Sequence, residues 1–241
     1  MFKEWVKKIF LGKRYSSESY INYLRSIGVK IGEDCTIYVP TKTLIDEQYP
    51  WMITIGDHVR ITEGCKLLTH DYSWSVLKLY AGGEIKENCG GIYGASGQVK
   101  IGNNVFIGMN TIICRGVAIG DNVIVGAGSI VTKDCASNSV YAGTPAKRIA
   151  GIEEFLEKRK KKQLYEAKEL AEGYYQRYGR KAPIEVFHEY FMLFTQADNI
   201  LPEFESKMKL CGNYEESWNY LKNHKPQFAS FEEFLEYCYG K

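Results

Sequence analysis

An aliphatic residue returns at every sixth position through the middle of the chain. The series runs through Ile101, Ile107, Ile113, Ile119, Val125 and Val131, and earlier stretches keep the same phase at Ile31, Ile37, Ile55, Ile61 and Leu67. Glycine, asparagine or aspartate stands between many of these positions, and such residues tolerate the positive φ of tight corners. A period of six belongs neither to an α-helix nor to an ordinary strand. It predicts short flat strands whose aliphatic side chains point into a narrow three-sided prism.

The repeat also predicts how these strands are held together. Three strands make one coil, and stacked coils bury a continuous aliphatic column while pairing their backbones with the coils on either side. Chance periodicity in an ordinary β-sandwich would not keep one phase over six consecutive repeats. We therefore predict a mainly β chain in which residues 29–150 form a parallel β-helix.

Both flanks of the repeats have helical patterns. Residues 16–28 begin with a serine that can cap a helix and end with a glycine that can stop it, so residues 1–28 are predicted to be a helical segment that plugs the prism. After Gly151 the apolar spacing changes to three and four residues, which predicts an α-helical C-terminal extension over residues 151–241.

Composition excludes several classes of function. The net charge of +2 gives no overall field for nucleic acid or an acidic membrane. Residues 1–14 mix lysines with apolar residues; this is neither a span nor a signal peptide, and such a stripe more often packs on its own protein than on a membrane. The seven cysteines form no Cys-x-x-Cys pair, which argues against a zinc site or a disulfide framework and favours a cytoplasmic protein.

One histidine is placed to act as a base. His70 lies at a corner of the prism, and the six-residue period stops directly after it. Residues 72–98 keep no phase, and long irregular loops are more often functional than idle. Histidine titrates near neutral pH, which suits proton transfer. His58 has the same corner phase, but the repeat runs through it unbroken, so we interpret His58 as a solvated corner residue.

Three motifs in this order resemble the hexapeptide-repeat acyltransferases: IGNNVFIGMNTII at 101–113, AIGDNVIVGAGSIVTKD at 118–134 and YAGTPAKRI at 141–149. The resemblance covers about residues 28–149. It is closest to the galactoside and maltose acetyltransferases and to the O-acetyltransferases of capsule and O-antigen synthesis. It implies a left-handed β-helix, a homotrimer with active sites between subunits, and His70 as the general base. A zinc enzyme on the same prism needs three histidines, but only His58 and His70 lie in the repeats, so no metal is expected.

The resemblance also implies acetyl-CoA as co-substrate. It places the oxyanion donor at the backbone N–H of Met109, and Phe106 stands where the galactoside enzymes have tryptophan. The predicted cofactor-binding residues are Phe106, Gly108, Gly126, Ala127, Thr132, Lys133, Lys147 and Arg148. For the acceptor we predict contacts from Asp46, Asp71 and Tyr72, although an acidic residue at a turn is more often a turn former.

Together these features predict an acetyl-CoA-dependent O-acetyltransferase. Its acceptor would be a hydroxyl of a small saccharide or glycan in cell-surface polysaccharide or saccharide modification, attacking the thioester directly. Two alternatives remain open. The first is an N-acyltransferase acting on a nucleotide-linked amino sugar or an antibiotic, a choice that depends on loop 72–98 and the neighbouring subunit. The second is a non-catalytic β-helix scaffold, against which His70 and the adjacent loop argue.

Overall fold

The chain folds into two compact units, residues 1–154 and 155–241, each with its own hydrophobic core. The computed structural model describes residues 8–80 and 90–240. Half of the amphipathic stretch at 1–14 and the middle of the loop at 72–98 therefore lie outside the described residues. Within the two described ranges, no helix is long and apolar enough to cross a membrane.

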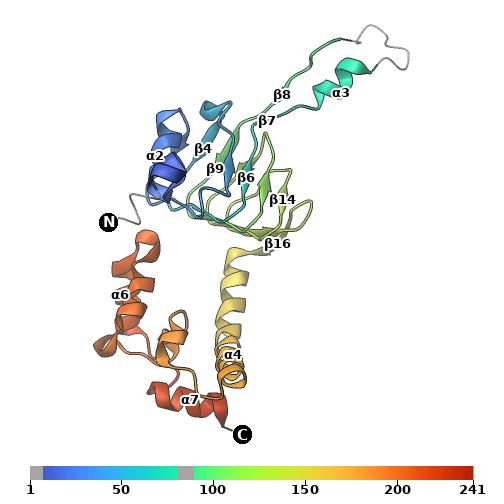
Figure 1. Ribbon diagram of the computed structural model, residues 1–241. Helices are drawn as coiled ribbons and strands as arrows, with labels where there is room; N and C mark the ends of the chain where they lie inside the picture. The colour runs from blue at the N-terminus through green and yellow to red at the C-terminus, as the bar shows by residue number, and fades with distance from the viewer. Residues whose placement is uncertain (1–7, 81–89, 241) are drawn as a thin grey trace. The chain divides into compact units, whose positions relative to one another are not determined.

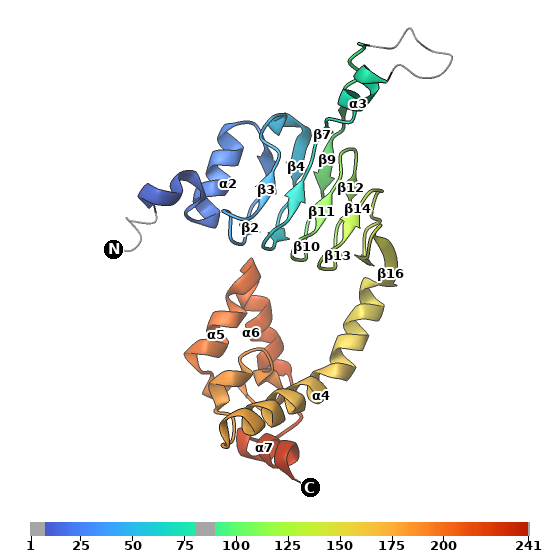
Figure 2. The same ribbon diagram turned by 45° about the vertical axis from the view of Figure 1, so that its right-hand side comes forward.

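Three parallel sheets form the faces of a prism in the first unit (Figures 1 and 2). Sheet 1 consists of β1 (Lys30–Ile31), β4 (Ile53–Ile55), β9 (Val99–Ile101) and β12 (Ala118–Ile119). Sheet 2 consists of β2 (Thr36–Ile37), β5 (Arg60–Ile61), β10 (Val105–Ile107), β13 (Val123–Val125) and β15 (Ser139–Ala142), with β16 (Lys147–Gly151) antiparallel at its edge. Sheet 3 consists of β3 (Leu44–Ile45), β6 (Lys66–Leu67), β11 (Ile112–Ile113) and β14 (Ile130–Val131). The chain visits the sheets in turn, which is the predicted parallel β-helix.

The predicted aliphatic column is the core of this prism. Ile31 pairs with Ile55, Ile55 with Ile101, and Ile101 with Ile119, so equivalent residues stack from coil to coil. Ile107, Ile113 and Val125, like most of the column, are buried. The corners use the left-handed backbone conformation that the sequence predicted, with φ of +53° at Asn104 and +54° at Asn122. The side chain of Asn104 donates to that of Asn122 at 2.8 Å, so the corners as well as the strands are bonded.

Helix α2 (Ser17–Ser26) covers one end of the prism, as predicted (Figure 2). The hydroxyl of Ser16 accepts a hydrogen bond from the Ser19 N–H at 3.1 Å and so caps the helix. Tyr20, Ile21 and Leu24 are buried in the same core as the aliphatic column. A short 3₁₀ turn, η1 (Gly12–Arg14), precedes the helix.

The prism is interrupted where the sequence loses its period. The β7 strand (His70–Asp71) pairs antiparallel with β8 (Ala95–Ser96), and the chain between them leads away from the coils to α3 (Trp74–Leu79) (Figure 1). We call this excursion between β7 and β8 the arm. The prediction of an irregular loop was therefore wrong for residues 74–79, which are helical. A second, shorter interruption of the coils lies between β3 and β4 and contains η2 (Pro50–Met52).

The second unit is helical. It contains most of α4 (Ile152–Tyr178), followed by α5 (Pro202–Met208), α6 (Tyr214–Asn223) and α7 (Phe231–Tyr239), with short 3₁₀ segments η4 (Ile184–Phe187), η5 (Phe191–Leu193), η6 (Ala197–Asn199) and η7 (Leu210–Gly212). Its core is rich in phenylalanine, including Phe187, Phe204 and Phe234. Helices hold more of the described residues than strands do, so the expectation of a mainly β chain is not confirmed.

The Gly108→Ala variant is expected to unfold at a lower temperature than the wild type. A Cβ at Gly108 would lie 2.4 Å from the backbone nitrogen of Ala127, an atom fixed in the next coil. Overpacking of this kind costs about 1–3 kcal/mol. Thermal denaturation followed by circular dichroism measures the effect. Gly173→Ala is the control, because a Cβ at Gly173 in α4 meets nothing within 4 Å. A Gly108→Ala melting temperature equal to that of the wild type would contradict the close-packed corner.

Candidate active site

A buried carboxylate holds His70. Nδ1 of His70 lies 2.6 Å from Oδ2 of Asp46. The Asp46 residue is 7% exposed, and the His70 side chain is 19% exposed. An ionised carboxylate only accepts hydrogen bonds, so this contact assigns the proton of the neutral ring to Nδ1 and leaves Nε2 as an acceptor. No described residue forms a hydrogen bond with Nε2. A base oriented by a carboxylate, with its second nitrogen free, is suited to taking a proton from a bound hydroxyl.

Both carboxylate oxygens of Asp46 accept hydrogen bonds from groups of its own chain. Oδ2 also accepts from the Thr69 N–H at 3.0 Å and the Thr69 hydroxyl at 2.5 Å, and Oδ1 accepts from the Gln48 N–H at 3.0 Å. Burial alone would raise the pKa of Asp46, but these hydrogen bonds and His70 outweigh it and hold the pKa below its ordinary value. The acceptor contact of Asp46 stays a prediction. Asp46 is placed to orient His70.

Strand register brings Asp46 and His70 together. Ile45 in β3 pairs with Leu67 in β6, so the residues after these two positions share the edge between sheets 3 and 1. Sequence reasoning selected both residues but did not pair them. The spacing of the repeat could have paired them. Asp46 directly follows Ile45, and His70 lies three residues after Leu67, the partner of Ile45 in the next coil.

His58 differs from His70 in its surroundings, as the sequence predicted. Its Nδ1 lies 2.9 Å from Oδ2 of Asp34, but the His58 side chain is 51% exposed. The same carboxylate is shared with the Arg60 guanidinium at 2.7 Å. The prism continues past His58 without an arm, so this pair lies on an open corner.

Asp71 forms a turn and an ion pair. Its Oδ1 accepts from the Ser73 N–H at 2.9 Å and the Ser73 hydroxyl at 2.5 Å, and its Oδ2 lies 2.7 Å from Nε of Arg115. The Ser73 hydrogen bonds and the Arg115 guanidinium hold the pKa of Asp71 well below its usual range. Both oxygens are engaged, which favours the turn-forming alternative over acceptor binding. Arg115, which sequence reasoning missed, comes from the next coil at the same edge.

Glu47, the neighbour of Asp46, ties the N-terminal segment to the prism. Its carboxylate accepts from Lys13 at 2.7 Å, Arg14 at 3.0 Å and the Tyr23 hydroxyl at 2.9 Å. Burial alone would raise the pKa of Glu47, but Lys13, Tyr23 and Arg14 lower it overall. Glu47 directly follows Asp46, so this network lies next to the partner of His70 in the chain.

Glu47→Gln is expected to lower the free energy of unfolding by about 1–3 kcal/mol near neutral pH, because charged donors lose their ionised partner. A depressed carboxyl pKa stabilises the fold above the unfolded value and loses this effect as pH falls through the folded value. The deficit should therefore shrink in urea titrations near pH 3. Glu33→Gln is the matched control, since the Glu33 side chain is 87% exposed in its pair with Arg25. A deficit independent of pH would refute the electrostatic account.

The predicted oxyanion donor lies at a different edge. Met109 follows β10 between sheets 2 and 3, where its carbonyl accepts from the Gly128 N–H at 2.7 Å. Its own N–H donates to none of the described residues. Gly108, Gly126 and Ala127 share this edge, and Phe106 is exposed on β10 beside it. The glycines are required here because the next coil leaves no room for a side chain at Gly108.

The remaining predicted cofactor residues lie elsewhere. Thr132 and Lys133 follow β14 at the edge between sheets 3 and 1, two coils beyond His70. Lys147 and Arg148 lie on β16, where Nε of Arg148 donates to the Ser139 hydroxyl at 3.0 Å. One chain therefore does not gather the predicted site. It places His70 with Thr132 and Lys133 on one edge and Met109 with the small residues on another.

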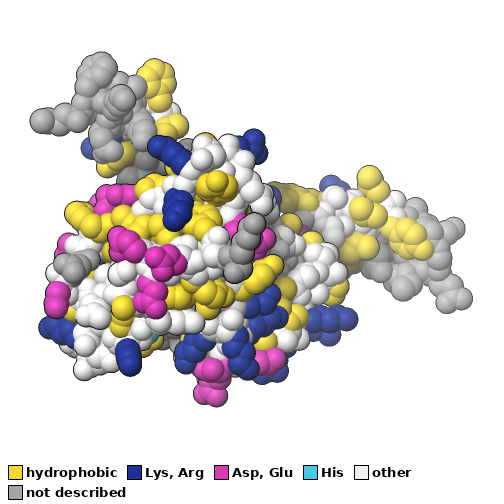
Figure 3. Space-filling view, turned by 90° about the horizontal axis from the view of Figure 1, so that it is seen from below, with side chains coloured by type: hydrophobic (Ala, Val, Ile, Leu, Met, Phe, Trp, Pro, Cys, Tyr) yellow, Lys and Arg dark blue, Asp and Glu magenta, His cyan; other side chains and the backbone are white. Residues whose placement is uncertain are grey.

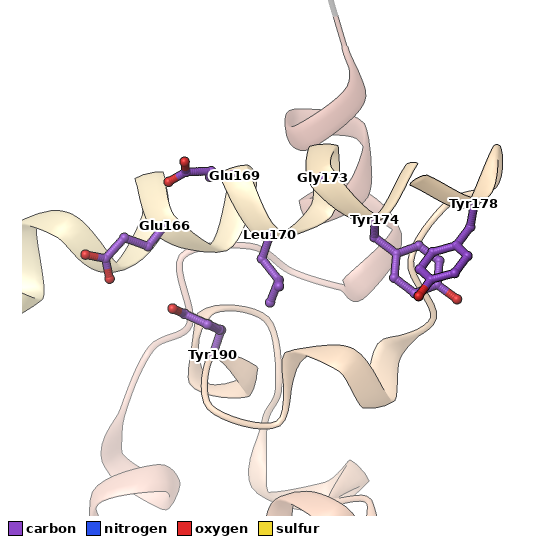
Figure 4. Close-up of a pocket in the computed structure, with 7 residues that line it drawn as sticks. All are labelled: Glu166, Glu169, Leu170, Gly173, Tyr174, Tyr178 and Tyr190. Carbon is purple, nitrogen blue, oxygen red and sulfur yellow. The ribbon is translucent and has the colours of Figure 1, made fainter. Parts of the chain in front are cut away.

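Two other surfaces do not resemble a reaction site. Basic and acidic side chains are both present on the face in Figure 3, in line with the net charge of +2. In the helical unit, Leu170, Gly173, Tyr174, Tyr178, Tyr190 and two glutamates line a shallow cleft of about 520 Å³ (Figure 4). Glu166 of this cleft is paired with Arg159 at 2.8 Å. The cleft contains no base held by an orienting partner.

The fold is a parallel β-helix, and a histidine–carboxylate pair lies at one of its edges. Hexapeptide-repeat proteins form the class that has this fold. Residues 98–133 match the family model for the hexapeptide repeat of succinyl-transferase. Protein CapG of Staphylococcus aureus is 47% identical over 153 residues, which cover 62% of this chain and 81% of CapG. The chain belongs to the hexapeptide-repeat acyltransferase family.

Solved structures of similar proteins include two named for acetyl transfer to sugars. A maltose O-acetyltransferase from Clostridium difficile 630 is 26% identical, with a TM-score of 0.44 over 61% of this chain and 81% of that chain. A galactoside acetyltransferase in complex with coenzyme A is 28% identical, with a TM-score of 0.40 over 56% of this chain and 70% of that chain.

Proposed function

We propose that this protein is an acetyl-CoA-dependent O-acetyltransferase that acts on a sugar hydroxyl in cell-surface polysaccharide synthesis. The observation that carries the proposal is the His70–Asp46 pair, in which Nδ1 contacts the carboxylate and Nε2 has no hydrogen bond to the described residues. Membership of the acyltransferase family supports the reaction type.

In the proposed reaction, Nε2 of His70 accepts the proton of the acceptor hydroxyl as its oxygen attacks the thioester carbonyl. Asp46 keeps the ring oriented and stabilises the imidazolium that forms. The Met109 N–H donates to the carbonyl oxygen as it becomes an oxyanion, a contribution of about 3 kcal/mol in comparable sites. Collapse of the intermediate breaks the carbon–sulfur bond, and the departing thiolate takes the proton from His70. The products are an acetyl ester and coenzyme A.

The separation of His70 and Met109 supports a site shared between subunits. The two residues lie on different edges of one prism, so a homotrimer would complete the site with His70 from one protomer and Met109 from its neighbour. Thr132, Lys133, Lys147 and Arg148 are proposed to hold the coenzyme phosphates, and Gly126 and Ala127 the pantetheine arm. Acetyl-CoA is the co-substrate, and the proposed mechanism uses no metal.

A calorimetric titration with acetyl-CoA tests the cofactor, and the product tests the bond formed. Saturable binding at about one site per chain is expected. An ester product is cleaved by mild alkali, whereas an amide survives it. Alkali-stable acetylation would establish the N-acyltransferase instead. A folded trimer that does not bind acetyl-CoA would leave a scaffold role.

A further inference from the structure

Five rings form a continuous row with His70 at its centre. From one end to the other the row contains Trp51, Tyr49, His70, Tyr72 and Trp74, and we call it the aromatic row. Successive ring centroids are 5.6 Å, 5.2 Å, 5.8 Å and 5.7 Å apart. The candidate base thus lies in the middle of an aromatic surface.

The two halves of the row come from separate excursions of the chain. Trp51 belongs to η2 and Tyr49 directly precedes it, whereas Tyr72 and Trp74 begin the arm. Both excursions leave the prism at the edge between sheets 3 and 1. Tyr49 and Tyr72 each contact His70, and no ring contact joins them to one another in the described chain, so the imidazole is the link between the two halves of the row.

Two rings of the row are open to solvent: Trp51 is 68% exposed and Tyr72 is 61% exposed, whereas Tyr49 and Trp74 are half-buried. Neighbouring rings are tilted by 39° to 72°, which leaves ring faces uncovered. Exposed aromatic residues that gather beside a candidate base indicate a ligand surface.

The chemistry of the row fits neutral sugar rings. A pyranose has an apolar face of C–H groups and a polar rim, which match ring faces and the hydroxyl and indole N–H groups of Tyr and Trp. The charges beside the row are already paired: Asp46 with His70, and Asp71 with Arg115.

We infer that the acceptor is a saccharide of at least two sugar rings, bound along the aromatic row so that an internal or subterminal hydroxyl meets His70. The inference rests on the proposed function. One sugar ring over the imidazole would leave an end of the row unused, whereas a second ring reaches Trp51 or Trp74.

Retention on an array of neutral mono- and oligosaccharides tests this inference. We expect the wild type to be retained at least about 10-fold more on probes of two or more rings than on their monosaccharides. Trp51→Ala and Trp74→Ala should each lower that retention about 10-fold or more and raise the KM for an oligosaccharide acceptor more than they lower kcat. Tyr165→Ala is the control, because Tyr165 in α4 is also 68% exposed and should leave retention unchanged.

Several outcomes would overturn the inference. Equal retention of monosaccharides and oligosaccharides, no retention of any neutral saccharide, or normal retention by both Trp variants would each refute it. Loss of the trimer in the Trp variants, measured by light scattering, would identify the row as a subunit interface instead. Calorimetry with acetyl-CoA runs in parallel: failure to bind it refutes the proposed function, whereas acetyl-CoA binding without saccharide retention refutes only the acceptor class.

Discussion

The His70→Ala variant is expected to turn over acetyl-CoA about 10²- to 10⁴-fold more slowly than the wild type, the contribution usual for a general base. Its affinity for acetyl-CoA should stay within about 2-fold, because the proposed cofactor contacts do not include the imidazole. Release of the free thiol of coenzyme A in the presence of a saccharide acceptor measures the first quantity, and calorimetry measures the second.

His58→Ala is the matched control for this experiment. His58 has the same phase in its coil and also contacts a carboxylate, but its pair with Asp34 is exposed and shared with Arg60. Its replacement should leave turnover unchanged. Normal turnover in His70→Ala would remove the general base from the mechanism, and a large loss in His58→Ala would move the site to the other corner.

The Asp46→Asn variant is expected to lower kcat by about 10- to 10³-fold, less than the roughly 10⁴-fold loss seen when the orienting aspartate of a catalytic triad is changed. An amide can donate to Nδ1, which would place the ring proton on Nε2 and prevent that nitrogen from accepting one. Imidazole nitrogen NMR of His70 should show the change of tautomer. The pH–rate profile should lose the rise in rate that reports a general base in its proton-accepting form.

Asp34→Asn is the corresponding control at the exposed pair. It should keep the kcat of the wild type within error, because Asp34 contacts His58 and Arg60 and not His70. If Asp46→Asn lowered only the melting temperature and left kcat unchanged, Asp46 would be a structural residue and not the partner that positions His70.

The regular part of the fold could be predicted because the aliphatic residue at every sixth position fixes the register in which neighbouring strands pair. Each aliphatic position both fills the core and fixes which residues pair, so Ile101 could be aligned with Ile119 from spacing alone. Helix caps were equally local, and Ser16 accepts from the Ser19 N–H at 3.1 Å as the sequence predicts. The share of β structure was overestimated because each strand is only a few residues long and corners take up the rest of every coil, whereas α4 runs for 27 residues.

The site was harder to predict because its parts lie where the period fails. The Asp46–His70 contact joins residues 24 apart across η2, whose length the repeat does not fix. The helix in the arm has six residues, too few for a helical period to show. No sequence pattern indicated that Tyr49 and Trp51 belong to the site. They come close to Tyr72 and Trp74 only because η2 and the arm both leave the prism at the same edge.

The two strands β7 and β8 form the stem of the arm, and they are hydrogen-bonded to each other as in a β-hairpin. The Gly97 N–H donates to the Thr69 carbonyl at 2.8 Å, and β7 pairs with β8 directly beyond it, so the chain re-enters the prism beside the point where it left. The coils are threaded in the same way whatever lies past that stem, and a longer insertion adds little closure entropy. The residues beyond the stem could therefore be replaced without changing the path of the coils or the position of His70.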